Sequence, residues 1–170
     1  SLNIYNRTKS SLKPFINSKA KIYSESLNLI KESDIVITMV SDGNAIKDIF
    51  NSGEIFHKFD ISNKIFLDMS TISPKTTIHM SEKANSSGNF WLDCPVLGST
   101  PAAKSGNLVF IVGGSREIYE DCRYVFDILG NKSMHMGPSG SGQAAKLVHN
   151  SICGVLGASI DFSKKNEMRI

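Results

Sequence analysis

Residues 137–150 form a glycine-rich loop that runs directly into a predicted helix. Within that helix, Lys146 and Asn150 are four residues apart and therefore lie on one face. A lysine ammonium in a partly dry site loses some of its preference for the charged form, so it can act as a general acid or base. The carboxamide of Asn150 would supply a hydrogen-bonding group beside it. The pair is a candidate polar active site, and the alternative is a solvated lysine and asparagine after an ordinary turn.

Small and hydroxyl residues follow several predicted strands, at the strand ends where doubly wound sheets bind ligands. They lie at residues 6–8, 40–42, 70–71 and 93–99. Each of these segments alone is compatible with simple turn chemistry. Their order along the chain, ahead of Lys146 and Asn150, favours a shared site.

The composition is that of an ordinary globular domain, with 170 residues of which 41% are apolar and 21% charged. The net charge of +3 is spread over the chain, which argues against a nucleic-acid partner and favours an anionic ligand. No apolar run reaches membrane-spanning length, so no membrane partner is expected. The three cysteines and four histidines show no metal-ligand spacing. We therefore expect no metal site, buried reduced thiols and a cytoplasmic location.

Predicted strands and helices alternate along the chain. The strands are expected at residues 2–5, 21–23, 35–40, 65–69, 90–93, 108–112 and 133–136. The helices are expected at residues 10–17, 24–31, 44–50, 74–86 and 117–129, and from about 142 nearly to the end. The β-branched run 35–40 is typical of a strand buried on both faces, and Ser73 is typical of a helix N-cap. The alternation predicts a doubly wound α/β sheet, and both ends look abrupt, as in a piece of a longer protein.

The ordered set of motifs resembles the β-hydroxyacid dehydrogenases, of the 3-hydroxyisobutyrate dehydrogenase type within the 6-phosphogluconate dehydrogenase group. The motifs that carry the resemblance lie at residues 6–8, 39–42, 68–71, 93–96, 112–114 and 140–142, followed by Lys146 and Asn150. The resemblance implies a Rossmann-type parallel sheet that lacks its first strand–helix unit and ends in the long helix leading into an all-α domain. It places a partial NAD(P)-binding domain at residues 1–138 and the start of the helical domain at 139–170.

The same resemblance implies a role for each site residue. Lys146 would be the acid/base that moves the substrate hydroxyl proton. The substrate would be held by Asn150 and Ser70, with its carboxylate on the backbone amides of Gly98 and Ser99. The cofactor would be bound by six residues at the strand ends, namely Asn6, Arg7, Thr8, Val40, Ser41 and Thr71. Leu97 departs from the pattern, because a serine is usual at that position.

The first strand end carries Arg7 and no acidic residue. A guanidinium suits the 2′-phosphate of NADP, whereas NAD selection usually depends on an acid at this point. We therefore expect NADP as the cofactor, with NAD as the alternative. The glycine-rich turn that binds the cofactor pyrophosphate in such domains is absent from this sequence.

The function implied is an NAD(P)-dependent oxidoreductase that oxidises a small β-hydroxyacid or reduces the matching aldehyde or semialdehyde. One alternative is a non-catalytic dinucleotide-fold module for scaffolding or oligomerisation, and another is an inactive truncated copy. A sugar acid like 6-phosphogluconate stays open as an alternative substrate. The complete protein would be a homo-oligomer, a dimer or tetramer, that binds a small carboxylate or aldehyde. Residues 1–170 alone are expected to be inactive and to self-associate.

Overall fold

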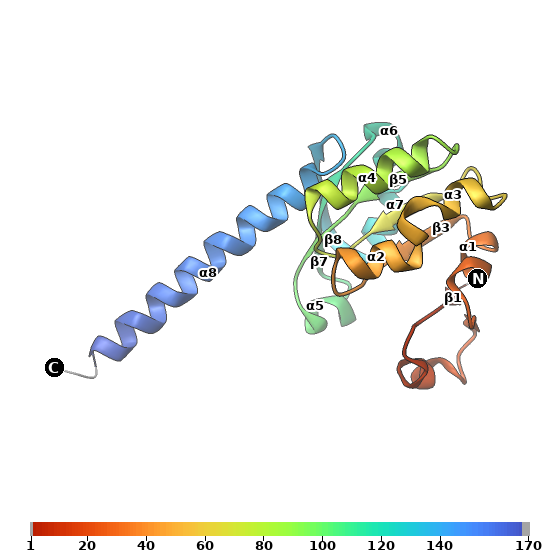
Figure 1. The fold of residues 1–170 in the computed structure, drawn as a ribbon. Coiled ribbons are helices and arrows are strands. Elements are labelled where there is room, and N and C mark those ends of the chain that lie inside the picture. The colour runs from red at the N-terminus through yellow and green to blue at the C-terminus, as the bar shows by residue number, and fades with distance from the viewer. Residues whose placement is uncertain (1, 168–170) are drawn as a thin grey trace.

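The protein is a layered α/β domain from which one long helix projects (Figure 1). The computed structural model describes residues 2–167, with side chains as far as Phe162. The strands are β1 (Asn3–Ile4), β2 (Lys21–Ile22), β3 (Ile35–Thr38), β4 (Ile65–Asp68), β5 (Phe90–Asp93), β6 (Val96–Leu97), β7 (Leu108–Gly113) and β8 (Gly130–Gly137). The helices are η1 (Lys9–Phe15), α1 (Ser26–Lys31), α2 (Gly43–Ile49), η2 (Asn51–Gly53), α3 (Ile55–Lys58), α4 (Pro74–Asn85), α5 (Thr100–Lys104), α6 (Arg116–Asp121), α7 (Arg123–Leu129) and α8 (Ser141–Glu167).

The main sheet has the order β3-β4-β5-β7-β6, with β8 also paired to β7. Strands β3, β4 and β5 are parallel, and their register aligns Thr38 with Asp68 and Asp68 with Asp93. Their carboxyl ends therefore meet at one edge of the sheet. Strand β7 runs antiparallel to β5 and β6 and parallel to β8. The predicted Rossmann-type α/β fold with a parallel sheet and a long final helix is confirmed, while the antiparallel pairings were not predicted.

Both faces of the main sheet are covered, as the doubly wound prediction requires. Alternate residues of a strand face opposite sides. On one side, Phe66 and Trp91 stack and pack with Phe50 beneath α2, α3 and α4. On the other side, Phe110 and Phe126 anchor a second core beneath α6 and α7. The sheet is thus a rigid platform whose strand ends are fixed from two sides.

Strands β1 and β2 form a small parallel sheet of their own, separate from the main sheet. Among the described residues, β1 pairs only with β2 and β3 pairs only with β4. This separation agrees with the expected sheet that lacks its first strand–helix unit, because no strand of the described chain bridges β1 and β3. The predicted burial of 35–40 on both faces is wrong, since Ile37 is 46% and Met39 66% exposed.

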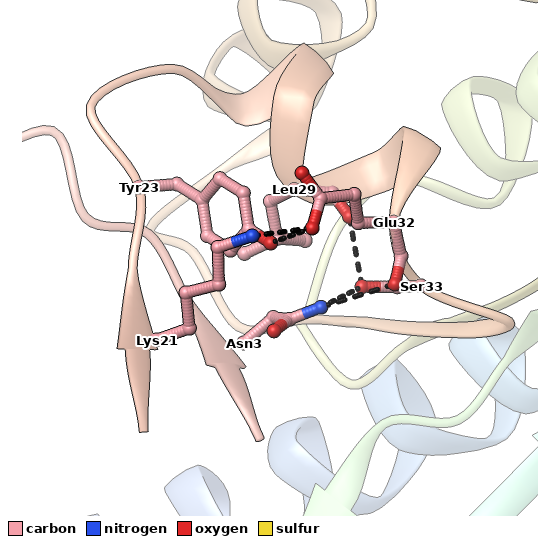
Figure 2. A network of polar contacts seen from close by, with 6 residues as sticks. All are labelled: Asn3, Lys21, Tyr23, Leu29, Glu32 and Ser33. Carbon is pink, nitrogen blue, oxygen red and sulfur yellow. Dashed lines mark hydrogen bonds and ion pairs between the residues drawn. The ribbon is translucent and has the colours of Figure 1, made fainter. Parts of the chain in front are cut away.

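The small sheet is anchored to the end of α1 by polar contacts (Figure 2). The Asn3 side-chain amide donates to Ser33 Oγ at 3.0 Å, and the Tyr23 hydroxyl donates to the Glu32 carboxylate at 2.7 Å. Lys21 forms an ion pair with the same carboxylate. Ser33 Oγ in turn donates to the Leu29 carbonyl at 2.8 Å. This part of the fold is held by exposed and half-buried polar contacts, and no further strand of the described chain pairs with β1.

Several local elements differ from the sequence prediction. The helix expected at 117–129 is divided into α6 and α7 at Cys122, whose ψ of 1° interrupts the helical path. The helix expected at 10–17 is a 3-10 helix that contains Pro14, and the short elements η2, α3, β6 and α5 were not predicted. Cys153 is exposed rather than buried. The N-cap at Ser73 is confirmed, because its hydroxyl accepts from the Thr76 amide at 3.1 Å. No helix within residues 2–167 is long and apolar enough to cross a membrane.

Candidate functional site

The first turn of α8 is fixed to the main sheet by a buried carboxylate. Asp93 closes β5 and is fully buried. Its two oxygens accept from the Gly140 amide at 2.8 Å and from the Gln143 amide at 2.9 Å. These amides are donors that the start of a helix otherwise leaves unpaired. Burial raises the pKa of Asp93 above its ordinary value, and the bonds from Gly140 and Gln143 act against that rise.

Two glycines allow the Asp93 carboxylate to approach α8. A Cβ at Gly113 would lie 2.7 Å from Asp93 Oδ1 and from the Gly142 amide nitrogen. A Cβ at Gly142 would lie 2.5 Å from the Ile111 carbonyl oxygen. Real Cβ atoms do not come this close to backbone atoms, so both positions require glycine. The helix therefore begins directly against the ends of β5 and β7.

The side chain of Gln143 ties the same turn of α8 to the loop after β4. It is fully buried, and its Nε2 donates to the Ser70 carbonyl at 2.8 Å. Its Oε1 accepts from the Ile72 amide at 3.0 Å. The Ser70 hydroxyl also accepts a hydrogen bond from the Val40 amide at 3.0 Å. The strand ends of β3 and β4 are thus joined to the start of α8 through one carboxamide.

A second buried carboxylate, Asp68, lies next to this loop at the end of β4. It accepts from the Thr38 hydroxyl at 2.8 Å and from the Ser70 amide at 3.2 Å, while its Oδ2 has no partner in the structure. Burial raises the pKa of Asp68 to about 6, and the negative charge of Asp93 adds to the rise. The carboxyl ends of β4 and β5 therefore carry two buried carboxyl groups, those of Asp68 and Asp93, next to the predicted site.

Lys146 lies one turn beyond Gln143 on α8 and is half-buried. Partial burial lowers the pKa of the Lys146 ammonium below its ordinary value, while Cys153 acts in the opposite direction. Asn150 lies one further turn along and is exposed. The structure places both residues on one helix, as predicted, directly above the turn that Asp93 and Gln143 hold. Their roles stay predictions.

Most of the predicted cofactor-binding residues surround a single cleft. The cleft lies between β1 and β3 and has a volume of about 970 Å³, in the range of small-molecule sites. Its rim includes Asn6, Arg7 and Thr8 from the end of β1, and Val40 and Ser41 from the end of β3. The structure therefore brings together residues that are more than 30 positions apart in the sequence.

The remaining predicted residues have different surroundings. Thr71 is exposed in the loop that Gln143 holds and does not line the cleft. Ser70 is fully buried, with its hydroxyl directed to the Val40 amide. Gly98 and Ser99 are exposed at the turn between β6 and α5, and the φ of +123° at Gly98 favours glycine. The hydrogen bond from Ala103 to the Ser99 carbonyl stays within that turn.

The strand-end side of the cleft carries polar side chains of the kinds that bind phosphate and ribose groups. Arg7 offers a guanidinium for a phosphate group. The pKa of Asp42 is lowered mainly by the hydrogen bond from the Ala45 amide, and the positive charge of Arg7 adds a smaller contribution. Asn6, Thr8 and Ser41 offer neutral hydrogen-bonding groups. In the part of the chain that the structure describes, no group of three or more His, Cys, Asp or Glu side chains could hold a metal ion.

The sequence reasoning missed Asp93 and Gln143 as site residues. Each carried a signal that was available before the structure. Asp93 is an acid that closes an otherwise apolar strand, and Gln143 is the one glutamine of the chain, at the start of the helix that carries Lys146. Such buried polar groups normally have specific partners.

The comparisons with known proteins agree with the resemblance. Residues 1–137 match the model for the NAD binding domain of 6-phosphogluconate dehydrogenase. A mitochondrial 3-hydroxyisobutyrate dehydrogenase of Drosophila melanogaster is 34% identical over 91% of this chain and 48% of its own length. A chloroplastic glyoxylate/succinic semialdehyde reductase 2 of Arabidopsis thaliana is 32% identical over 93% of this chain and 44% of its own length.

A solved structure gives the same result. The 3-hydroxyisobutyrate dehydrogenase of Mycobacterium tuberculosis with L-serine superimposes with a TM-score of 0.84 at 26% identity, over 92% of this chain and 53% of that one. The chain spans about half the length of the relatives that it matches. These relatives are dehydrogenases and reductases. The chain therefore belongs to the family of nicotinamide dinucleotide-binding domains of the 6-phosphogluconate dehydrogenase type.

Proposed function

We propose that this chain is the cofactor-binding part of an oxidoreductase that interconverts a small β-hydroxyacid and the matching aldehyde or semialdehyde. The observation that carries the proposal is the placement of Lys146. This lysine is half-buried, its pKa is lowered, and its helix is held against the carboxyl edge of the sheet by Asp93 and Gln143. The relatives' names, which specify hydroxyisobutyrate and semialdehydes, support the substrate class.

The strand-end mouth of the cleft would hold the cofactor. Asn6, Arg7 and Thr8 would contact its ribose and phosphate, while Val40, Ser41 and Thr71 would lie toward the nicotinamide. When bound, a nicotinamide dinucleotide supplies the two-electron redox chemistry of the reaction. We propose NADP rather than NAD, because Arg7 carries the positive charge that a 2′-phosphate requires.

The substrate would lie between the cofactor mouth and α8. A lysine with a lowered pKa is more readily neutral at physiological pH, so Lys146 would accept the hydroxyl proton during oxidation and return it during reduction. Asn150 would hydrogen-bond the substrate from the same helix face. The amides of Gly98 and Ser99 would receive its carboxylate, and Ser70 would contribute through the loop that it shapes.

Residues 139–170 would begin an all-helical domain that closes the pocket, and the complete protein would be a homo-oligomer. A sugar acid stays the alternative substrate. A non-catalytic scaffold is the alternative function, and the presence of both Lys146 and Asn150 favours the enzyme.

The test is turnover by the full-length protein with NADPH or NADH and a panel of small semialdehydes, and with the matching hydroxyacids in the reverse direction. We expect turnover with NADPH to be the more efficient. Lys146→Ala should lower turnover by about 10²–10⁴-fold and leave cofactor binding nearly unchanged. Lys132→Ala, which alters an exposed lysine on β8, is the matched control and should leave turnover unchanged. Near-normal turnover of Lys146→Ala, or no turnover with any substrate of the panel, contradicts the proposal.

A further inference from the structure

The buried polar contacts at the base of α8 form a continuous path from the rim of the cleft to the helix that carries Lys146. The Val40 amide donates to the Ser70 hydroxyl, and the Ser70 carbonyl accepts from Gln143 Nε2. Gln143 is itself the residue whose amide donates to Asp93. One end of this path is the rim of the cleft, which the proposed function assigns to the cofactor (the cofactor rim). The other end is the first turn of α8.

Helix geometry relates Gln143 to the two predicted reacting residues. Lys146 is three positions and Asn150 seven positions beyond Gln143. Residues with these spacings share one face of an α-helix. A side chain fixed at position 143 therefore determines the direction in which positions 146 and 150 point.

Gln143 and Asp93 fix different properties of the helix. The Gln143 carboxamide is clamped between the Ser70 carbonyl and the Ile72 amide, which sets the rotation of α8 about its own axis. Asp93 holds the Gly140 and Gln143 amides and so sets how closely the helix approaches the end of β5. Gly142, with no room for a Cβ, maintains that approach.

We infer that Gln143, seated by Asp93, is a positioning residue that aims Lys146 and Asn150 toward the loop 70–72 and the cofactor rim. The catalytic consequence of this inference rests on the proposed function, in which Lys146 exchanges the substrate proton. The geometric part stands on the contacts alone. A reacting group displaced by about 1 Å loses roughly 10²-fold in rate, so fixing the rotation of its helix has a large effect on turnover.

The competing interpretation is that Gln143 only stabilises the fold. Asn89 provides a control, because it is also a fully buried carboxamide and bonds to three backbone groups, one of which is the Ser87 carbonyl at 3.1 Å. Its Oδ1 accepts from the Lys64 amide at 3.1 Å and its Nδ2 donates to the Ile61 carbonyl at 3.0 Å. Asn89 precedes β5 and lies at the opposite end of that strand from Asp93. A general loss of stability should therefore be similar for the two carboxamides, whereas an effect on Lys146 should be specific to Gln143.

The experiment compares Gln143→Met and Asn89→Leu, each of which keeps the length of the side chain and removes its hydrogen bonds. The first readout is the pKa of Lys146, measured by NMR titration of the lysine ε-carbons and assigned with Lys146→Arg. This readout uses the chain itself and needs no turnover. We expect the pKa of Lys146 to rise toward 10.5 in Gln143→Met and to stay unchanged in Asn89→Leu.

The second readout is the kinetics of the full-length protein. Gln143→Met should lower kcat by roughly 10²-fold and change the KM for the cofactor much less, because Asn6, Arg7 and Thr8 follow β1 and have no bond to Gln143. Asn89→Leu should leave both constants unchanged at temperatures where it is folded.

An unchanged pKa of Lys146 in Gln143→Met, or an equal shift in Asn89→Leu, would overturn the inference. If Gln143→Met does not fold, Gln143→Asn decides the question, since it keeps the carboxamide but is one methylene too short to reach both backbone groups. It should also raise the pKa of Lys146, and an unchanged value would again overturn the inference. If Lys146→Ala retains turnover, the proposed function fails, whereas the pKa readout still decides the role of Gln143.

Discussion

The two parts of α8 have opposite relations to the rest of the molecule. Its first turn is buried against β5, β7 and the loop after β4, and its polar groups there are paired. The remainder projects from the domain (Figure 1) and carries an apolar stripe without a covering partner in the described structure. That stripe consists of Val148, Ile152, Val155, Leu156 and Ile160. One helix thus combines a fixed base, where small changes should be costly, with a projecting part, where the same changes should be tolerated.

The largest effect is expected from adding a methyl group at the base of the helix. Gly142→Ala would place its Cβ 2.5 Å from the Ile111 carbonyl oxygen and 2.8 Å from the Asp93 carboxylate. Relief of this overlap must move backbone atoms and weaken the bonds to Asp93. We expect a loss of about 3 kcal/mol or more in the free energy of unfolding, measured by urea denaturation. A loss below about 1 kcal/mol would show that the base is less tightly packed than the contacts indicate.

The pH dependence of the free energy of unfolding should reveal the buried carboxyl group of Asp68, which lies near the first turn of α8. Burial raises the pKa of Asp68 from 3.8 to about 6, so the folded protein holds this proton more tightly than the unfolded chain. The contribution of Asp68 to stability is complete below pH 4 and is lost as the pH rises through 6. A rise of this size corresponds to about 3 kcal/mol as an upper limit.

Asp68→Asn should remove this contribution. Urea unfolding between pH 4 and pH 7 should therefore show a shallower fall in stability for the variant than for the unaltered protein. Asp93 contributes in the same direction, and its contribution stays in both proteins. Curves that run parallel over the whole range would contradict the raised pKa of Asp68.

The projecting part of α8 should drive self-association of the chain. Val155 is 67% exposed, and burying such a side chain in a contact between copies contributes about 1.5–3 kcal/mol. Val155→Lys should therefore weaken association by at least about tenfold in sedimentation equilibrium, with little change in unfolding. Asn131→Lys adds the same positive charge at an exposed position on β8 and controls for the change in charge. Equal association of the Val155 variant and the unaltered chain would locate the contact elsewhere, for example at the open edges of β1 and β3.

The smallest effect is expected from the same methyl group placed on the projecting part. Apart from the backbone of the helix itself, no atom of the described residues lies within 4 Å of a Cβ built at Gly154 or Gly157. Alanine is preferred over glycine within a helix by about 0.5–1 kcal/mol, so Gly157→Ala should increase helix content in circular dichroism. A clear loss of helix would mean that this part of α8 has a close neighbour. The contrast with Gly142→Ala measures the difference between the two parts of the helix directly.

Local sequence patterns predicted much of the fold and part of the site. The apolar runs identified the main strands, and Ser73 identified the start of α4. The predicted strand-end residues from Asn6 to Ser41 do surround one cleft. The prediction of burial failed where it depends on neighbouring elements. Ile37 belongs to a β-branched run, but its face of β3 is exposed in the described structure. The prediction also failed at Cys122, where packing divides a continuous amphipathic segment into two helices.

The sequence by itself determined that Lys146 and Asn150 share a helix face, because helical periodicity depends only on spacing along the chain. Only the tertiary structure decided which way that face points. The bonds that set it join Gln143 to residues 50, 71 and 73 positions away. The lowered pKa of Lys146 has the same origin, since burial depends on the atoms that surround a side chain rather than on its neighbours in sequence.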